Sequence, residues 1–347
     1  MIQIGKDARA ALAAALMIFT TQALGADLIP VTVGTANSAT DIAVYVAEKK
    51  GFFREEGLDV SYIAFDSAAK MIAPFASGDL DVGGGGTSAG LYNAVARGID
   101  IKIVADKNHT PPGQGIQPLL VRKDLVDSGR YKTLADLKGM KISTAAPGSA
   151  ASTTLDRALK MGGLKLADVD QVYMGFPQQA VALANKAIDA AFTAEPSATQ
   201  AVNSGSAVRV MGDDEIYPMH QLAVVFYAGG FIKKKPEAAR RYMRAYLKGV
   251  RYYNDAIVNG RLSGPRGEEI VAILAEKIPL KDNSLYNTLI APACDPDGKV
   301  QLKSLAEDLE FFRAAGQIEG AVTLEQALDS SFAEAAVAQL GPYQRRP

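Results

Sequence analysis

The 347-residue sequence has no tryptophan, one cysteine and two histidines. Without tryptophan, an indole cage or an indole stacking platform for a ligand is excluded. The single cysteine, Cys294, excludes an internal disulfide, and we expect it to be a small, buried hydrophobic residue. His109 and His220 lie far apart in the sequence, which argues against a histidine-rich metal site. We therefore expect neither a metal nor a cofactor.

Neither sign of charge is in marked excess, because the formal net charge is −1. A basic excess that points to nucleic acid is missing, as is the long block of like charges typical of a disordered tail. Hydrophobic residues make up 48% of the chain, which is enough for two domains with cores of their own. We predict a globular protein with no nucleic-acid partner.

The N-terminus carries a marked apolar run. Lys6 and Arg9 precede an apolar stretch over residues 10–20, and small residues follow at Ala23 and Gly25. The stretch fits the secretory h-region of about 7–15 residues and is too short to span a bilayer. We predict a cleavable signal peptide over residues 1–26, with a buried N-terminal helix as the alternative. The mature protein is then expected in the periplasm.

Four consecutive glycines at positions 83–86 lie in the most informative stretch. Residues 77–90 predict a turn, a short buried strand on Leu80 and Val82, and a small-residue loop that opens a helix. Thr87 and Ser88 are suitable N-cap residues for that helix. Glycines let another group approach the backbone closely, and a helix N-terminus presents free N–H groups. The stretch therefore favours binding of a small ligand's polar group.

The same pattern recurs later in the chain. Residues 185–197 again predict a turn, an aliphatic-Asp-small strand, a polar loop and a helix. Val31 precedes Leu80 by 49 positions, and Met140 precedes Ile188 by 48 positions. Two β-α-β-α-β units of equal size predict an α/β fold with two similar lobes, whose strand ends face each other across a cleft.

The connections between the lobes are predicted at apolar strands near residues 119–121 and 222–227, which would form a two-strand hinge. Lobe 1 then comprises residues 27–117 and 225–347, and lobe 2 comprises residues 118–224. From residue 236 onward the pattern is helical, and we expect these extra C-terminal helices to pack on lobe 1. The helices are predicted over residues 238–257, 268–277, 284–291, 302–315 and 324–337.

Loops at the carboxyl ends of the predicted strands carry residues that would face the cleft. Helix N-termini and hydroxyl groups favour an anion, whereas carboxylates favour an amino group or a ring N–H. No lysine or arginine lies in these loops, so a bound anion would depend on neutral donors. Each residue taken alone is also explained by capping or turn formation. The candidate ligand-binding residues are Asn37, Ser38, Asp66, Thr87, Ser88, Ser149, Phe176 and Glu195.

Residues 86–90 also match the G-x-S-x-G nucleophile elbow between a strand and a helix. A secreted serine hydrolase with Ser88 as nucleophile is therefore the alternative function. Only His109 and His220 could supply its base, and His109 leaves little chain for an acid in the required order. The glycines fit a dinucleotide-binding pattern as well, with Asp106 as the ribose acceptor, but an exported protein rarely meets a dinucleotide.

Several motifs together resemble one family of substrate-binding proteins of ABC importers, which serve nitrate, sulfonates, taurine and thiamine-precursor pyrimidines. Residues 45–60, YVAEKKGFFREEGLDV, are similar to the opening signature of this family. Further similar stretches cover nearly the whole mature chain. They are residues 77–83, 134–142, 195–196, 295–298 and 328–332.

This resemblance implies a type II periplasmic-binding-protein fold and delivery of a small molecule to a membrane permease with its ATPase. The export signal and the low histidine content argue against an enzyme, and we predict a monomeric receptor without enzymatic activity. The ligand stays open among nitrate, a sulfonate, taurine, an aromatic acid and a pyrimidine. Phe176 could stack on an aromatic ligand, and Glu195 could accept a hydrogen bond from an amino group.

Overall fold

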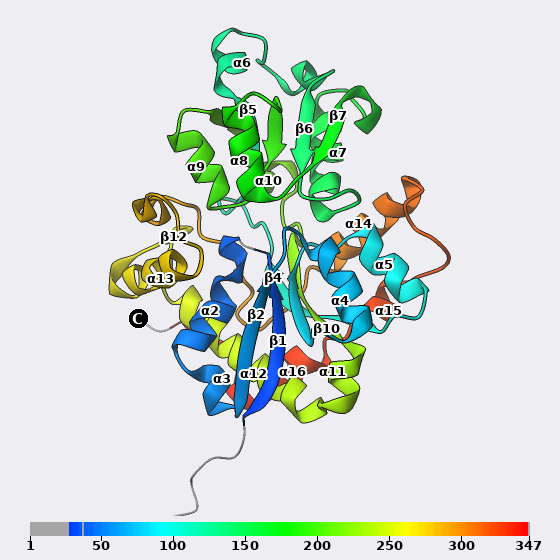
Figure 1. Cartoon of the computed structure of the whole chain (residues 1–347), viewed down its shortest axis with the longest axis vertical. Coiled ribbons are helices and arrows are strands. Elements are labelled where there is room, and N and C mark those ends of the chain that lie inside the picture. The colour runs from blue at the N-terminus through cyan, green and yellow to red at the C-terminus, as the bar shows by residue number, and fades with distance from the viewer. Residues whose placement is uncertain (1–27, 37, 346–347) are drawn as a thin grey trace, which may run out of the picture.

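The computed structural model describes residues 28–36 and 38–345, arranged as two lobes one above the other (Figure 1). The predicted signal peptide lies outside the described residues. Each lobe contains a five-stranded sheet, ordered β2-β1-β3-β10-β4 in lobe 1 and β7-β6-β8-β5-β9 in lobe 2. The matching orders confirm the two similar α/β lobes that the repeat predicts.

The strands of the first sheet are β1 (Ile29–Thr35), β2 (Leu58–Ala64), β3 (Val82–Gly85), β4 (Ile101–Asn108) and β10 (Ala223–Ala228). Those of the second are β5 (Leu119–Arg122), β6 (Lys141–Thr144), β7 (Asp170–Tyr173), β8 (Ala190–Phe192) and β9 (Ala207–Met211). In each sheet three neighbouring strands are parallel. The next strand, β10 or β5, is antiparallel to both of its neighbours. The chain passes from one lobe to the other just before β5 and again just before β10. The strand that follows each passage therefore takes the same position in both sheets.

The two passages, residues 109–118 and 212–222, lie side by side. Thr110 N–H donates to His220 O at 3.0 Å, and Met219 N–H donates to Thr110 O at 2.8 Å. The second passage also contains the short helix α10 (Asp213–Ile216). The crossings were predicted at the strands near 119–121 and 222–227, but those strands lie within the sheets as β5 and β10, and the two bonded passages before them connect the lobes.

Helices cover both sheets. Lobe 1 has α2 (Ile42–Lys49), α3 (Phe52–Glu55), α4 (Ile72–Ser77) and α5 (Ala89–Ala96). Lobe 2 has α6 (Lys123–Asp127), α7 (Ala150–Met161), α8 (Phe176–Ala184) and α9 (Ser197–Asn203). The C-terminal helices are α11 (Gly229–Lys234), α12 (Pro236–Asn254), α13 (Gly264–Lys277), α14 (Leu302–Ala314), α15 (Leu324–Ala327) and α16 (Ser331–Leu340). Short 3-10 helices are η1 (Ala39–Asp41), η2 (Ala68–Met71), η3 (Leu134–Leu137), η4 (Leu166–Asp168) and η5 (Asn283–Asn287). None of the helices in the described ranges is long and apolar enough to cross a membrane.

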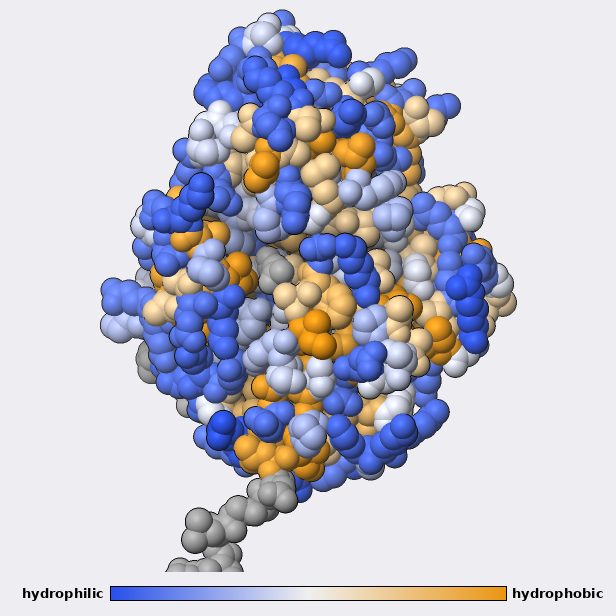
Figure 2. Space-filling model, in the orientation of Figure 1, coloured by the Kyte–Doolittle hydropathy of each residue, from blue (hydrophilic) through white to orange (hydrophobic). Residues whose placement is uncertain are grey.

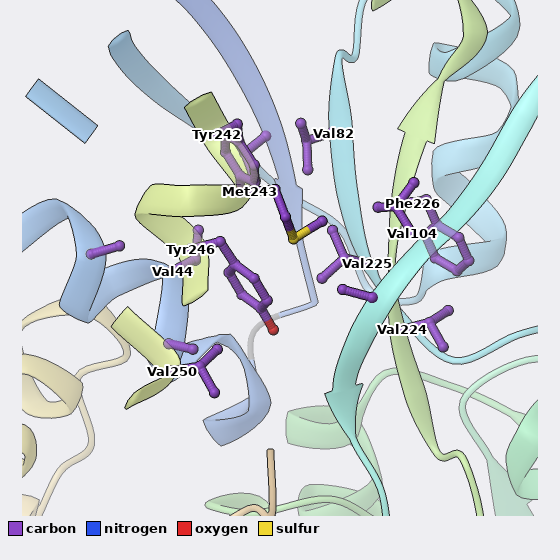
Figure 3. Close-up of a cluster of buried hydrophobic side chains, with 14 of the residues drawn as sticks. Val44, Val82, Val104, Val224, Val225, Phe226, Tyr242, Met243, Tyr246 and Val250 are labelled. Atoms are coloured by element: carbon purple, nitrogen blue, oxygen red, sulfur yellow. The ribbon is translucent and has the colours of Figure 1, made fainter. Parts of the chain in front are cut away.

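Helix α12 supplies much of the core of lobe 1. Its predicted apolar positions Tyr242, Tyr246 and Val250 are buried, and Figure 3 shows them in one cluster with Val44, Val82 and Val225. A Cβ at Gly249 would lie 2.4 Å from Ala43 O of α2, so only glycine allows these two helices to pack this closely. On the face of the molecule in Figure 2, hydrophilic residues cover much of both lobes.

Three of the four glycines, Gly83 to Gly85, lie in strand β3 where the sequence predicts a loop, and Gly86 lies in the loop before α5. Leu80 precedes β3, and Val82 begins it. A Cβ at Gly83 would lie 2.7 Å from the Phe75 ring, and one at Gly85 would lie 2.7 Å from Ala68 Cβ. Gly83 and Gly85 therefore accommodate neighbouring parts of the same lobe, whereas Gly86 faces Ala150 of the other lobe.

The C-terminal helices differ from the prediction at two places. A helix is predicted over residues 324–337, but the chain leaves helical geometry at Leu328 and Asp329, where Asp329 N–H donates to Ile103 O at 2.8 Å. The helix predicted over 284–291 is reduced to η5. Two strands, β11 (Ile257–Val258) and β12 (Arg261–Leu262), form a hairpin that helical periodicity does not reveal. The prediction that Cys294 is buried is confirmed.

Candidate functional site

A cleft lies between the lobes, where the loops at the carboxyl ends of the strands meet. It contains about 600 Å³ of unoccupied space, its open mouth included. Among the described residues that line it, none carries a charge. The polar lining residues are Ser38, Thr40, Ser67, Ser88, Gln117 and Ser149. The larger apolar ones are Ile116, Phe176 and Leu222, and the rest are alanines and glycines.

The lobes are closed over this cleft. Three backbone hydrogen bonds join them: Ala39 N–H to Glu195 O (2.9 Å), Ala89 N–H to Gly148 O (2.8 Å) and Ala150 N–H to Thr87 O (3.0 Å). Ser88 and Ser149 face each other as an isolated antiparallel bridge. Since these serines precede α5 and α7, the two helices begin next to each other, one from each lobe.

Four of the eight predicted ligand-binding residues, Ser38, Ser88, Ser149 and Phe176, line the cleft. Ser88 caps α5 as predicted, because its Oγ accepts a hydrogen bond from Leu91 N–H at 3.2 Å. Ser149 Oγ is buried and has no hydrogen-bond partner among the described residues. The two lobes thus bring hydroxyl groups together from loops that are far apart in the sequence.

Three predicted residues are placed elsewhere, and Asn37 lies outside the described residues. The Thr87 side chain is fully buried and does not line the cleft. Asp66 is exposed and pairs with Lys70. Both loops reach the cleft through the neighbouring Ser67 and Ser88, while Asp66 pairs with Lys70 at the surface and Thr87 is buried in the interior.

Glu195 is buried, and its carboxylate faces away from the cleft. Its Oε2 accepts a hydrogen bond from Thr199 N–H at 2.9 Å, in the first turn of α9. Burial raises the pKa of this carboxyl against the opposing effect of that hydrogen bond. The side chain lines a separate groove with Arg209 and Arg261. As a result, it is not placed to accept a hydrogen bond from a ligand in the cleft.

Thr40, Ser67 and Gln117 also line the cleft and are not among the eight predicted ligand-binding residues. Thr40 and Ser67 each lie within two residues of a predicted site residue, so the loops themselves were a usable signal. Gln117 belongs to the first passage between the lobes, and only the tertiary structure brings it to the cleft. Its backbone N–H donates to Asp213 Oδ1 at 3.0 Å.

The hydrolase alternative needs a base for Ser88, and the described part of the chain provides none by hydrogen bonding. His109 Nδ1 lies 3.1 Å from Asp106 Oδ2 and borders a different cavity. His220 Nε2 lies 2.9 Å from Asp308 Oδ2. Nor do residues 28–36 and 38–345 contain a group of three or more His, Cys, Asp or Glu side chains that could hold a metal ion.

Stability is expected to fall by about 2 kcal/mol between pH 5 and pH 7 through the titration of Asp213. Burial, with the nearby charge of Asp214, raises the pKa of Asp213 to about 7, although the bond from Gln117 N–H opposes this. Between its unfolded-state and folded-state pKa values, Asp213 holds a proton in the folded state that it has released in the unfolded state. The stabilisation is complete below the unfolded pKa of about 4 and is lost as the pH rises towards 7.

Urea unfolding at pH 5 and pH 7 measures this effect. Asp213→Asn keeps an oxygen for Gln117 N–H but cannot titrate, so its stability should fall less than that of the wild type over the same interval. Equal losses in the two proteins would contradict the assignment to Asp213.

Comparisons with known proteins agree with this architecture. The chain matches the model of the family described as NMT1/THI5 like over residues 39–256. A Brucella abortus protein named as a candidate binding protein is 29% identical over 235 residues, covering 67% of this chain and 69% of the relative. An Escherichia coli K12 protein named as a candidate aliphatic sulfonates-binding protein is 29% identical over 154 residues, covering 44% of this chain and 45% of the relative.

Solved structures share the two-lobe fold. The periplasmic nitrate-binding protein NrtA from Synechocystis PCC 6803 has a TM-score of 0.76 at 13% identity, covering 91% of this chain and 90% of its own. The alkanesulfonate-binding protein SsuA from Xanthomonas axonopodis pv. citri, bound to MOPS, has a TM-score of 0.69 at 17% identity, covering 88% of this chain and 99% of its own. The desulfurization enzyme DSZB has a TM-score of 0.59 at 17% identity, covering 89% of this chain and 99% of its own. Because an enzyme shares this fold, the function has to be argued from the cleft.

Proposed function

This chain belongs to the NMT1/THI5-like family, and we propose that it is the solute-binding receptor of an ABC importer. It captures a small ligand in the cleft between its lobes and delivers it to a membrane permease with an ATPase. The receptor acts as a monomer in the periplasm. The relatives named as binding proteins and the N-terminal pattern of an export signal support this assignment.

The observation that carries the proposal is the closed cleft with an unpaired hydroxyl inside it. A buried polar group without a partner costs about 1–3 kcal/mol. Ser149 Oγ is in this condition when the lobes are closed. A ligand that bonds to it removes this cost only in the closed state, so ligand binding and lobe closure favour each other.

The uncharged lining restricts the ligand. The helices α5 and α7 direct their N-termini to the Ser88–Ser149 contact, and each helix dipole favours a negative group by about 0.3–1 kcal/mol. Phe176, Ile116 and Leu222 offer an apolar surface to the rest of the ligand. Nitrate, sulfonates, taurine, aromatic acids and pyrimidines are the classes to test, and the relatives named for nitrate and sulfonates support an oxyanion.

A thermal-shift screen of the exported protein tests the proposal, with nitrate, ethanesulfonate, taurine, benzoate and 4-aminopyrimidine as probes. A probe at about 100 times its Kd that binds only the folded state adds about 2.7 kcal/mol of stability. We expect one class of probe to raise Tm. No shift with any probe, together with esterase turnover that Ser88→Ala abolishes, would contradict the receptor and favour the hydrolase.

Ser149→Ala is expected to weaken the binding of the responding probe about 2- to 12-fold, since a hydrogen bond contributes about 0.5–1.5 kcal/mol net. Ser143→Ala is the matched control, because Ser143 is a buried serine of the same lobe that does not line the cleft. Isothermal titration calorimetry on both variants measures the difference. An equal loss in the two variants would show that Ser149 does not contact the ligand.

A further inference from the structure

We propose that Lys107, a buried lysine behind the cleft wall, makes the Ser38–Thr40 hydroxyl pair a hydrogen-bond donor to the ligand and thereby selects an oxyanion. The inference rests on the proposed receptor function and names the ligand class. The loops of the cleft contain no lysine or arginine, and Lys107 comes instead from β4, 67 positions after Thr40.

Lys107 is held in the interior by a specific set of contacts. Its side chain is 5% exposed, and its Nζ lies 2.7 Å from Asp41 Oδ1. The same Nζ donates to Thr40 Oγ1 at 3.1 Å. A Cβ at Gly84 of β3 would lie 2.8 Å from Lys107 Cδ. Part of the glycine run therefore makes room for this lysine.

Asp41 compensates the buried charge and shapes the loop. Its Oδ2 accepts hydrogen bonds from Ala36 N–H at 3.1 Å and from Ser38 N–H at 3.2 Å. Neither Asp41 nor Lys107 lines the cleft, whereas Ser38 and Thr40 both do. The ligand thus meets the buried ion pair only through these two hydroxyl groups.

The hydrogen-bond inventory of the pair leaves a proton for the cleft. An ammonium group only donates, so Thr40 Oγ1 accepts from Lys107. Ser38 Oγ and Thr40 Oγ1 lie 2.7 Å apart, and this bond uses one of their two protons whichever of them donates. Thr40 N–H donates to Ser38 Oγ at 3.3 Å and occupies a further acceptor position. The second hydroxyl proton is then available to a group in the cleft.

The chain from Lys107 to Thr40 to Ser38 has a preferred direction. When Thr40 donates to Ser38, both acceptor positions of Ser38 are occupied, and Ser38 can only donate to the ligand. Successive bonds that point the same way polarise and strengthen one another, and this chain starts at a positive charge. An oxyanion accepts such a bond, whereas an ammonium group or a ring N–H has nothing to accept it with.

The test compares wild type with the double variant Lys107→Met and Asp41→Asn. The single change at Lys107 would leave the Asp41 carboxylate buried without its partner, which is strongly destabilising. The second change, Asp41→Asn, removes that charge, and its amide oxygen can still accept from the two backbone N–H groups. Calorimetry measures binding of nitrate, ethanesulfonate, taurine and benzoate, with ethylamine and butylamine as the amino probes, because both are ammonium ions at neutral pH and have no acceptor atom.

We expect wild type to bind an oxyanion in preference to the amino probes. The double variant should bind the same oxyanion at least tenfold more weakly, and its cooperative unfolding would show that the variant is still folded. Ser38→Ala should cost more affinity in the wild-type background than in the double variant, which a merely structural role of Lys107 would not produce. Unchanged oxyanion affinity in the double variant, or a preference of wild type for an amino probe, overturns the inference and leaves the receptor function intact. No binding of any probe by wild type overturns both.

Discussion

Replacing Gly148 with leucine is expected to weaken ligand binding about 5- to 150-fold. Gly148 lies in the loop before α7, and a Cβ there would be 3.1 Å from Ala89 Cβ and 2.9 Å from Gln317 Oε1. Both neighbours belong to lobe 1, so the added side chain meets them only when the lobes close. Overpacking of this kind costs about 1–3 kcal/mol. The cost applies to the closed state alone and lowers the population that can bind.

Gly163→Leu is the matched control for Gly148→Leu. Both glycines have a positive φ, +54° at Gly148 and +72° at Gly163, so leucine strains the backbone at either position. A Cβ at Gly163 has no neighbour within 4 Å. We expect both variants to lose stability and only Gly148→Leu to lose affinity, as measured by calorimetry with the probe from the thermal screen. Equal affinities in the two variants would mean that closure tolerates a side chain at this position.

His220→Ala is expected to lower the free energy of unfolding by about 3–5 kcal/mol. His220 is fully buried, and its Nε2 lies 2.9 Å from Asp308 Oδ2 on α14. Asp308 Oδ1 has no hydrogen-bond partner among the described residues. Removing the imidazole would leave this carboxylate buried without a partner. The ring also stacks on Tyr217, with centroids 4.1 Å apart, and contacts Thr154 of α7.

His109→Ala provides the comparison, because His109 forms the other histidine–aspartate pair. Its partner Asp106 is equally buried but keeps two further donors when the histidine is removed, Gln221 Nε2 at 2.5 Å and Asp295 N–H at 2.6 Å. We therefore expect a loss of about 1 kcal/mol or less. Urea unfolding at one pH measures both variants. Similar losses would indicate that pairing with Asp308 is not the source of the effect.

The sequence predicts which loops form the site better than it predicts which side chains line the cleft. Ser38, Ser88 and Ser149 each precede a helix that follows a strand, and this local pattern places them at the cleft. Glu195 also follows a strand, yet its carboxylate bonds to Thr199 N–H and turns away. The sequence shows that a residue lies in such a loop, whereas the direction of its side chain depends on how α9 packs.

The glycine run illustrates the same limit in the fold. Glycine disfavours strands, so residues 83–86 predict a loop that a ligand approaches. In the structure Gly83 and Gly84 pair with β10, a strand that begins more than 130 positions later in the chain. Their missing side chains leave space for Phe75 and Lys107. Local propensity was overruled by packing that no window of neighbouring residues contains.

By itself, the sequence determined that the chain forms two α/β lobes of equal construction and which loops face each other, because these follow from periodicity and repetition. Its composition also determined that those loops contain no basic residue. The tertiary structure decided which hydroxyl groups meet in the closed cleft and placed Lys107 behind Thr40. Contacts between residues far apart in the chain depend on how strands order and helices pack. For this reason the positive charge behind the cleft wall is invisible in the loops and becomes apparent only when β4 and η1 lie side by side.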